Sequence, residues 1–249
     1  MSYGQTPHMA QWAIHDRLVR ILLRTIEELD AAGLPRRLLE LGAGHGALAP
    51  YALAAGWEAT VVDMSPASLE HLRSRYGAND RLRTIDPEAG LDATGDGYAL
   101  ALCVSVLHHV PDYVSLVDLL ADRVAPGGAV LTMEDPLWYP RVGRVKRSLD
   151  RGAYLAWRIA RGNVAEGLAA MRRRLRGEYP PDEPGTIVYH HVVRQGVDEE
   201  AVARRLQQRF AEVEVMRYWS HHLAASRVAA ERAGLANTFA TRARGRVEA

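Results

Sequence analysis

The sequence has few of the features that mark secreted, membrane-spanning or nucleic-acid-binding proteins. Its 249 residues include a single cysteine, Cys103, which excludes an internal disulfide framework and fits a reducing compartment. No apolar run approaches the roughly 18 residues of a membrane span, and the polar N-terminal residues lack the apolar segment of a secretory signal. The formal net charge is only +1, which gives no general attraction to nucleic acid or membrane. We therefore expect a cytoplasmic protein with no membrane partner.

Lysine is almost absent, because Lys146 is the only one among 31 basic residues. We attribute this arginine bias to genome composition rather than to function, so an arginine cluster alone does not define a binding site. The chain is long enough for one large domain. We expect a single domain over residues 1–249, with a helical N-terminal segment over 1–34.

The apolar residues alternate between strand and helix patterns along the first half of the chain. A helix is predicted over 9–32. Strands are predicted over 37–41, 58–64, 82–86, 98–107 and 129–135, with helical segments over 47–56, 65–77 and 112–128. Such alternation is typical of right-handed crossover units that build a parallel sheet covered on both faces. Ser65 is expected to cap the helix over 65–77.

The alternation breaks after Pro136. Residues 138–176 are strongly basic and helical in pattern, and a proline-rich loop and an extended segment over 186–193 follow. We interpret 138–188 as an insertion that caps the ligand side of the sheet. A helix over 198–210, capped by Asp198, precedes strands over 211–220 and 237–245, which are expected to pair as an antiparallel hairpin at the sheet edge.

A glycine-rich turn follows the first predicted strand. Its glycines, Gly42, Gly44 and Gly46, have G-x-G-x-G spacing, which differs from the G-x-G-x-x-G of dinucleotide-binding proteins. Glu40 ends the first strand, where it can accept a hydrogen bond from an ammonium group, and Asp63 ends the second, where it can bind both ribose hydroxyls. An adenosine with a charged amino-acid tail would satisfy all three features. A nicotinamide dehydrogenase is the alternative, disfavoured by the glycine spacing and by Glu40.

These motifs resemble those of the class I S-adenosylmethionine-dependent methyltransferases. "LLELGAGHG", "VVDMS", "YALALCVSVLHHVPDY", "LADRVAPGGAVLTMEDP" and "GLANTFATRARG" occur in the order and at the distances of that family. The resemblance covers residues 36–136 and about 210–246. It implies an α/β fold with a Rossmann-like, doubly wound seven-stranded sheet, a helical cap insertion after the fifth strand and an antiparallel C-terminal strand. It also implies S-adenosylmethionine as the cofactor.

The resemblance assigns roles to individual residues of the cofactor site. Gly42 and Gly44 would let the backbone approach the cofactor, Glu40 would hold its ammonium group, and Asp63 would bind the ribose. Met64 would pack on the adenine, and Ser105 and Leu107 would lie beside the methionine portion. The acid that meets the adenine amine is Asp86 or Glu88, and we favour Asp86. The complete expected set is Glu40, Gly42, Ala43, Gly44, Asp63, Met64, Asp86 and Ser105.

The catalytic candidates are less well defined, because methyl transfer needs a base only when the acceptor must lose a proton. Six of the ten histidines form adjacent pairs. In an extended segment neighbours point to opposite faces, so at most one of each pair would face a common pocket. The candidates are His108, His191 and Glu134, and Asp135, beside Glu134 at the end of the fifth strand, is the alternative to Glu134. His221 and His222 are expected to be structural or exposed, Cys103 to be packing, and no metal site is expected because no ligand spacing supports one.

The substrate pocket is expected to combine the N-terminal segment, the end of the fourth strand and the insertion. Its candidate residues are Tyr3, Trp12, His109, Trp138, Tyr139 and His190. The arginines and aromatic residues of the insertion suit a small and acidic molecule. The alternative is that they are a solvated helix surface.

The predicted function is methylation of a small molecule on oxygen, nitrogen or carbon, in bacterial specialised metabolism. One alternative is methylation of RNA or protein that docks on the basic insertion, although nucleic acid is disfavoured because the rest of the chain is not basic. A second alternative is a protein of this fold that binds the cofactor without transferring the methyl group. A homodimer is compatible with the helical surfaces, but no heptad pattern establishes one.

Overall fold

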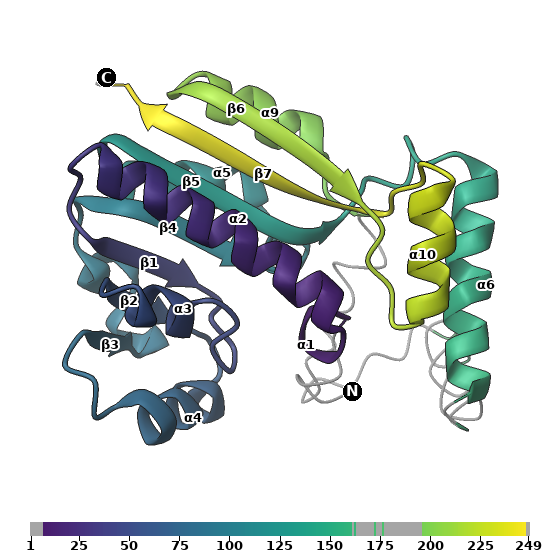
Figure 1. Cartoon of the computed structure of the whole chain (residues 1–249), viewed down its shortest axis with the longest axis horizontal. Helices are drawn as coiled ribbons and strands as arrows, with labels where there is room; N and C mark the ends of the chain where they lie inside the picture. The colour runs from purple at the N-terminus through teal and green to yellow at the C-terminus, as the bar shows by residue number, and fades with distance from the viewer. Residues whose placement is uncertain (1–6, 161, 163–171, 173–175, 177–195, 248–249) are drawn as a thin grey trace.

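The computed structural model describes residues 7–160, 162, 172, 176 and 196–247. A seven-stranded sheet in the order β3-β2-β1-β4-β5-β7-β6 forms its centre (Figure 1). The strands are β1 (Arg37–Leu41), β2 (Glu58–Val62), β3 (Leu82–Ile85), β4 (Tyr98–Val104), β5 (Val124–Pro136), β6 (Phe210–Tyr218) and β7 (Thr238–Arg246). The first five strands are parallel, whereas β7 is antiparallel to both β5 and β6. The predicted fold class and C-terminal hairpin are therefore confirmed.

Helices cover both faces of this sheet (Figure 1). They are α1 (Pro7–Ala10), α2 (Trp12–Ala31), α3 (Ala49–Ala54), α4 (Pro66–Tyr76), α5 (Tyr113–Arg123), α6 (Arg144–Ala160), α9 (Glu199–Gln207) and α10 (Ala224–Arg232). Adjacent strand residues face opposite layers, so Leu38 packs in the core beneath α2 and α3, and Leu39 packs in the core beneath α5 and α9. This explains why the central strands are apolar throughout.

Local signals set several helix starts as predicted. The Ser65 side chain accepts a hydrogen bond from Ser68 N at 3.3 Å, and Pro66 occupies the first helical position of α4. The Asp198 side chain accepts hydrogen bonds from Glu200 N and Ala201 N at the start of α9. Both predicted caps are confirmed.

Other boundaries differ from the prediction. The fourth strand ends at Val104 instead of residue 107, and a 3₁₀ helix, Leu107–His109, follows it. The turn "VAPGG" was expected to lie outside the fifth strand, but β5 begins at Val124 and includes it. Helix α10 was not predicted, because its segment has only a weak apolar pattern in the sequence.

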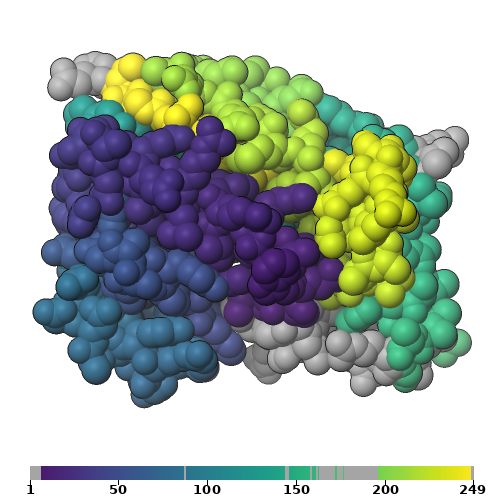
Figure 2. All heavy atoms as spheres, viewed as in Figure 1, coloured from purple at the N-terminus to yellow at the C-terminus, as the bar shows by residue number. Residues whose placement is uncertain are grey.

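The helices α6 and α10 lie beside each other at one end of the sheet (Figure 1). Helix α6 belongs to the segment 138–188 in which the cap insertion is predicted. In the space-filling view, the N-terminal helices lie between α10 and the half of the molecule that contains α3 and α4 (Figure 2). Within the described ranges, no helix is both long and apolar enough to cross a membrane.

Candidate active site

Acidic and polar side chains gather where the parallel strands end. Glu40 lies in β1, Asp63 follows β2, Asp86 follows β3 and Ser105 follows β4. Because the carboxyl ends of parallel strands meet at one edge of a sheet, these residues border a common region. This edge is where ligands bind in open α/β sheets.

The glycine-rich turn requires glycine for two reasons. Gly42 and Gly44 have φ angles of +70° and +53°, in the left-handed region that residues with a Cβ atom rarely adopt. A Cβ atom on Gly42 would lie 2.4 Å from Val106 Cγ2, so this turn packs directly against the segment that follows β4. The turn is tied to β2 because Gly42 N donates a hydrogen bond to Val62 O at 2.8 Å.

Replacing Gly42 by alanine is expected to lower the free energy of unfolding by about 2–3 kcal/mol, since it combines an unfavourable φ with a steric clash. Gly33 provides the control, because its φ is +72° and a Cβ atom there would have none of the described atoms within 4 Å. Gly33→Ala should lower the free energy of unfolding only through the unfavourable φ, by about 1 kcal/mol. Urea denaturation measures both values; equal losses would show that the contact with Val106 is unimportant.

Asp63 holds the glycine turn and the start of α4 together. Its Oδ2 atom accepts a hydrogen bond from Gly44 N at 2.7 Å, and its Oδ1 atom accepts one from Ser65 N at 2.8 Å. The half-buried carboxylate is thereby fixed beside the turn. Two oriented oxygens at this position are the arrangement that a vicinal diol requires.

Glu40 is fully buried, and only one of its two carboxylate oxygens has a hydrogen-bond partner among the described residues. Its Oε2 atom accepts a hydrogen bond from Ala49 N at the start of α3 at 2.8 Å. Its Oε1 atom has no hydrogen-bond partner among the described residues. Burial raises the pKa of this carboxyl to about 8, and the nearby Asp63 adds to the shift. A buried oxygen without a partner is rare in native proteins and indicates a place for a ligand donor.

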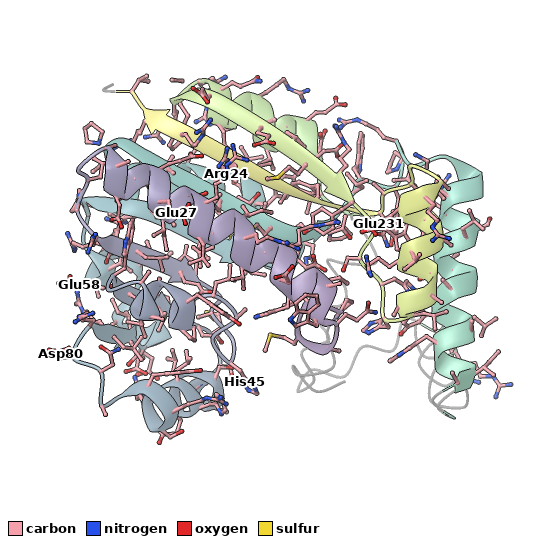
Figure 3. All side chains as sticks on the ribbon, viewed as in Figure 1. Arg24, Glu27, His45, Glu58, Asp80 and Glu231 are labelled. Atoms are coloured by element: carbon pink, nitrogen blue, oxygen red, sulfur yellow. The ribbon has the colours of Figure 1, made fainter. Side chains whose placement is uncertain are left out.

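Met64 and Asp86, the two residues expected to contact the adenine, follow β2 and β3 at this edge of the sheet. Met64 is 83% exposed, so its side chain is accessible for packing against a ring. Asp86 pairs with Arg73 in a bidentate contact of 2.9 and 3.0 Å, and the Arg73 guanidinium also reaches Thr84. Both assignments to the adenine stay predictions. Figure 3 labels His45, which comes from the glycine turn and lies near α4. Its ring stacks on the ring of His71 of α4, with centroids 4.5 Å apart.

Two non-glycine residues with positive φ mark the ends of β4 and β5. They are Ser105, with φ +59°, and Glu134, with φ +65°. Ser105 N donates a hydrogen bond to Met133 O at 2.7 Å, and the pairing of β5 with β7 shifts register between Met133 and Asp135. Backbone strain of this kind is concentrated at functional sites. The bulge changes the direction of the side chains that follow it.

The buried pair His108–Asp135 lies at the same edge. One oxygen of Asp135, Oδ1, contacts His108 Nδ1 at 2.7 Å and accepts a hydrogen bond from His108 N at 3.1 Å. Asp135 is 0% exposed and His108 is 6% exposed. Burial lowers the pKa of the histidine to about 4, so its ring is neutral at pH 7. With Nδ1–H donating to the carboxylate, Nε2 carries the lone pair that can accept a proton.

His109 lies next to His108 in a way that the sequence pattern did not predict. The two ring centroids are 3.8 Å apart with an interplanar angle of 48°. The expectation that neighbouring histidines face opposite sides was wrong here, because residues 107–109 form a 3₁₀ helix instead of an extended segment. His109 is half-buried, and its assignment to the substrate pocket stays a prediction.

Glu134, the other described catalytic candidate, is held by a different set of groups. It accepts a hydrogen bond from the Tyr218 hydroxyl at 2.9 Å and another from the Ser220 hydroxyl. Burial raises the pKa of its carboxyl to about 7. Tyr218 packs in the core beneath α2, and Arg17 of α2 lies over its ring. The contact with His108 is thus made by the adjacent Asp135, and Glu134 joins β5 to the end of β6.

The N-terminal helices approach this edge. His8, in α1, is 1% exposed, and its pKa is lowered to about 4 by burial and by the nearby His15 and His108. The Gln11 side chain donates a hydrogen bond to His221 O, which ties the junction of α1 and α2 to the segment after β6. Trp12 is 78% exposed, so packing in the protein core does not explain it. Its assignment to the substrate pocket stays a prediction.

The two aromatic candidates after β5 lie in different surroundings. Trp138 is half-buried, lies beneath the Arg141 guanidinium at 4.9 Å, and lines a cavity of about 240 Å³ with Lys146 and Glu199. Tyr139 packs against the core beneath α5 and α9. Arg141 itself pairs with Asp198 at 2.6 Å. The remaining candidates, Tyr3, His190 and His191, lie outside the described residues. Among the residues that the structure does describe, no cluster of three potential metal ligands is found.

Two contacts near this edge were not predicted from the sequence. The sequence pattern gave no sign that Asp135 contacts His108. His221 and His222 were expected to be structural or exposed, and this stays a prediction: His221 is 5% exposed, and both rings contact Tyr154 of α6, a contact that was not predicted. The repeated His-His pairs were the available signal, and the sequence did not show which pair meets the insertion.

Comparison with known proteins is consistent with this arrangement. A sequence model of the methyltransferase domain family matches residues 12–165. The ubiquinone biosynthesis O-methyltransferase of Bordetella avium (strain 197N) is 32% identical over 111 residues, covering 43% of this chain and 46% of that protein. Methyltransferase str2 of Strobilurus tenacellus is 31% identical over 190 residues, covering 71% of this chain and 62% of that protein. The match to the first relative thus spans less than half of its length.

A solved structure with the same fold extends the likeness to nearly the whole chain. The N-methyltransferase NodS from Bradyrhizobium japonicum WM9, in complex with S-adenosyl-L-homocysteine, has a TM-score of 0.53 at 16% identity. The alignment covers 96% of this chain and 88% of that one. At this identity the likeness shows the fold alone. Together with the family match over more than half of the sequence, it establishes that the chain belongs to the class I S-adenosylmethionine-dependent methyltransferases.

Proposed function

We propose that the protein transfers a methyl group from S-adenosylmethionine to a hydroxyl group of a small molecule. The cofactor supplies an electrophilic methyl group on a positively charged sulfur. The residues present fit its parts: the unpartnered Oε1 of Glu40 suits the ammonium group, and the oriented Asp63 carboxylate suits the ribose hydroxyls. The strained Ser105 suits a contact with the methionine portion. These assignments also follow the family resemblance.

The observation that supports oxygen as the acceptor is the buried His108–Asp135 pair. A hydroxyl must lose its proton as its oxygen attacks the methyl carbon. A neutral His108 held at Nδ1 by Asp135 can take that proton on Nε2, and the resulting imidazolium is stabilised by the adjacent carboxylate. The bond from oxygen to carbon forms as the bond from carbon to sulfur breaks, and S-adenosylhomocysteine leaves. Oxygen methylation also agrees with the name of the Bordetella relative, which is an O-methyltransferase.

We infer that the acceptor is a small molecule with an acidic group. The helix α6 presents three basic residues, Lys146, Arg147 and Arg151, and one acid, Asp150, around a small cavity beside Trp219. Arg141 contributes less, because it is already paired with Asp198, Glu199 and Glu200. The buried cysteine in β4 agrees with the cytoplasmic location that we propose. We also propose a role in specialised metabolism; the similarity to methyltransferase str2 of Strobilurus tenacellus supports the methyl-transfer activity itself.

Methyl transfer from labelled S-adenosylmethionine tests this function. The full chain is incubated with small hydroxylated acids, bulk tRNA or denatured protein, and the label is followed by mass spectrometry. We expect label on a small-molecule oxygen, and a loss of about tenfold or more in cofactor affinity for Asp63→Ala. Label only in tRNA or protein would contradict the small-molecule proposal. Cofactor binding without transfer to any oxygen would indicate another acceptor atom or a non-methylating role.

A further inference from the structure

His221 presents a buried hydrogen-bond donor for which the described residues provide no acceptor. Its Nδ1 atom accepts a hydrogen bond from Leu223 N at 3.0 Å, so that nitrogen carries the lone pair. Burial lowers the pKa of the ring, so the neutral form predominates at pH 7 and its proton resides on Nε2. Nε2 is buried and has no hydrogen-bond partner among the described residues. An unsatisfied buried donor is costly, and it needs an acceptor from water or a ligand.

Aromatic rings surround this donor. The Tyr154 ring meets the His221 ring edge-on at 6.5 Å, and the rings of Trp219 and His222 lie at 6.4 and 6.1 Å. Trp157 stacks on His222 with centroids 4.3 Å apart and an interplanar angle of 22°. We call these five residues the aromatic cluster: Tyr154, Trp157, Trp219, His221 and His222. Such flat, polarisable surroundings favour a planar ring over an aliphatic group.

The aromatic cluster is connected to the candidate active site by two contacts. The backbone oxygen of His221 accepts a hydrogen bond from Gln11, which follows α1 and its buried His8. Ser220, the residue before His221, donates a hydrogen bond to Glu134, and the next residue, Asp135, holds His108. The segment that carries the His221 donor therefore contacts Glu134, and His108 contacts the adjacent Asp135.

We propose that the aromatic cluster is the acceptor-binding subsite, and that it selects an aromatic ring carrying an oxygen substituent that accepts a hydrogen bond from His221 Nε2–H. This inference rests on the proposed function, because it identifies the acceptor class of the same methyl-transfer site. His221 is a specificity-determining residue in this account, and Trp157 and Tyr154 supply the ring surface. His108 keeps the separate task of accepting the proton.

The test uses the full chain loaded with S-adenosylhomocysteine, so that binding is measured without turnover. The probes are 4-hydroxybenzoate and trans-4-hydroxycyclohexanecarboxylate, which share the same two oxygen groups but differ in aromaticity. Calorimetry and tryptophan fluorescence measure their dissociation constants. We expect the aromatic probe to bind about tenfold more tightly and to quench the fluorescence.

Two substitutions at one position isolate the donor. His221→Phe keeps a ring and loses the Nε2–H donor, whereas His221→Gln keeps a donor at about the same reach; both lose the Nδ1 acceptor. We expect His221→Phe to weaken 4-hydroxybenzoate binding by about tenfold and His221→Gln to restore most of that loss. The affinity for S-adenosylhomocysteine should be unchanged in both, which also shows that both variants are folded.

Three results would overturn the inference. Equal affinities for the two probes would remove the aromatic selectivity, and equal affinities of the Phe and Gln variants would show that His221 donates only to a buried water. Failure of 4-hydroxybenzoate to bind the loaded wild type would exclude the subsite. Loss of S-adenosylhomocysteine binding by the wild type would instead contradict the proposed function itself.

Discussion

Replacing His108 by glutamine is expected to lower kcat by about 10²- to 10⁴-fold, the usual contribution of general base catalysis. The cause is the loss of the neutral imidazole that takes the acceptor proton. Because burial holds the pKa of His108 at about 4, the wild-type kcat should be level from pH 6 to 8 and should fall only below about pH 5. Steady-state kinetics on the identified acceptor measure both effects, with the variant's affinity for S-adenosylmethionine unchanged.

Asp135→Asn provides the matching test of the pair. The asparagine oxygen can still accept hydrogen bonds from His108 N and Nδ1, but a neutral amide no longer stabilises the imidazolium that forms when Nε2 takes the acceptor proton. We therefore expect a loss in kcat comparable to that of the His108 variant, and little further loss when both changes are combined. Asp118→Asn, which alters an α5 carboxylate paired with Arg205, is the control and should leave kcat unchanged. A wild-type kcat in both site variants would show that His108 is structural.

The affinity for S-adenosylmethionine is expected to rise about 50-fold between pH 6 and pH 8. The buried Glu40 has a pKa of about 8 and is largely protonated at pH 7. An ammonium group at Oε1 requires the ionised form, so binding should release about one proton at pH 7, and affinity should change about tenfold per pH unit below the pKa. Calorimetry in buffers of different ionisation enthalpy measures the proton release.

The controls separate Glu40 from other titrating groups. Glu40→Gln should abolish the proton release and should weaken binding most at pH 8. The nucleoside 5′-methylthioadenosine, which lacks the amino-acid tail, should bind the wild type with no such pH dependence. Proton release that persists in Glu40→Gln, or that appears with the nucleoside, would assign it to another group.

The raised pKa of the buried Glu40 carboxyl also affects the free energy of unfolding of the protein without ligand. A carboxyl whose folded-state pKa is raised stabilises the fold at low pH, and this contribution is lost as the pH rises through the folded-state pKa. Glu134, with a pKa of about 7, acts in the same direction. His8 and His108 have pKa values lowered to about 4, so their contribution to the free energy of unfolding rises with pH. This opposing effect is confined to pH values below their unfolded-state pKa, near 6.5. Between pH 6.5 and 8, the free energy of unfolding should therefore fall with rising pH, which urea denaturation at several pH values measures.

The sequence by itself determined the parallel part of the sheet and the main features of the glycine turn. Strand and helix periodicity depend on the nearest neighbours in the chain, and so do the caps Ser65 and Asp198, which explains why these elements were predictable. The positions of Glu40 and Asp63 at strand ends follow from the same pattern. Their partners were less accessible to sequence reasoning, because the hydrogen bond of Asp63 to Gly44 spans 19 residues.

Only the tertiary structure decided which polar residues meet at the edge of the sheet where the parallel strands end. The contact of His108 with Asp135 joins residues 27 positions apart, and it depends on the bulge at Glu134 that sets the direction of Asp135. The contact of Tyr154 with His221 needs α6 to lie against the segment after β6. Side-chain pairing across a sheet depends on strand register and on local breaks in it, and neither is written in the periodicity of one segment.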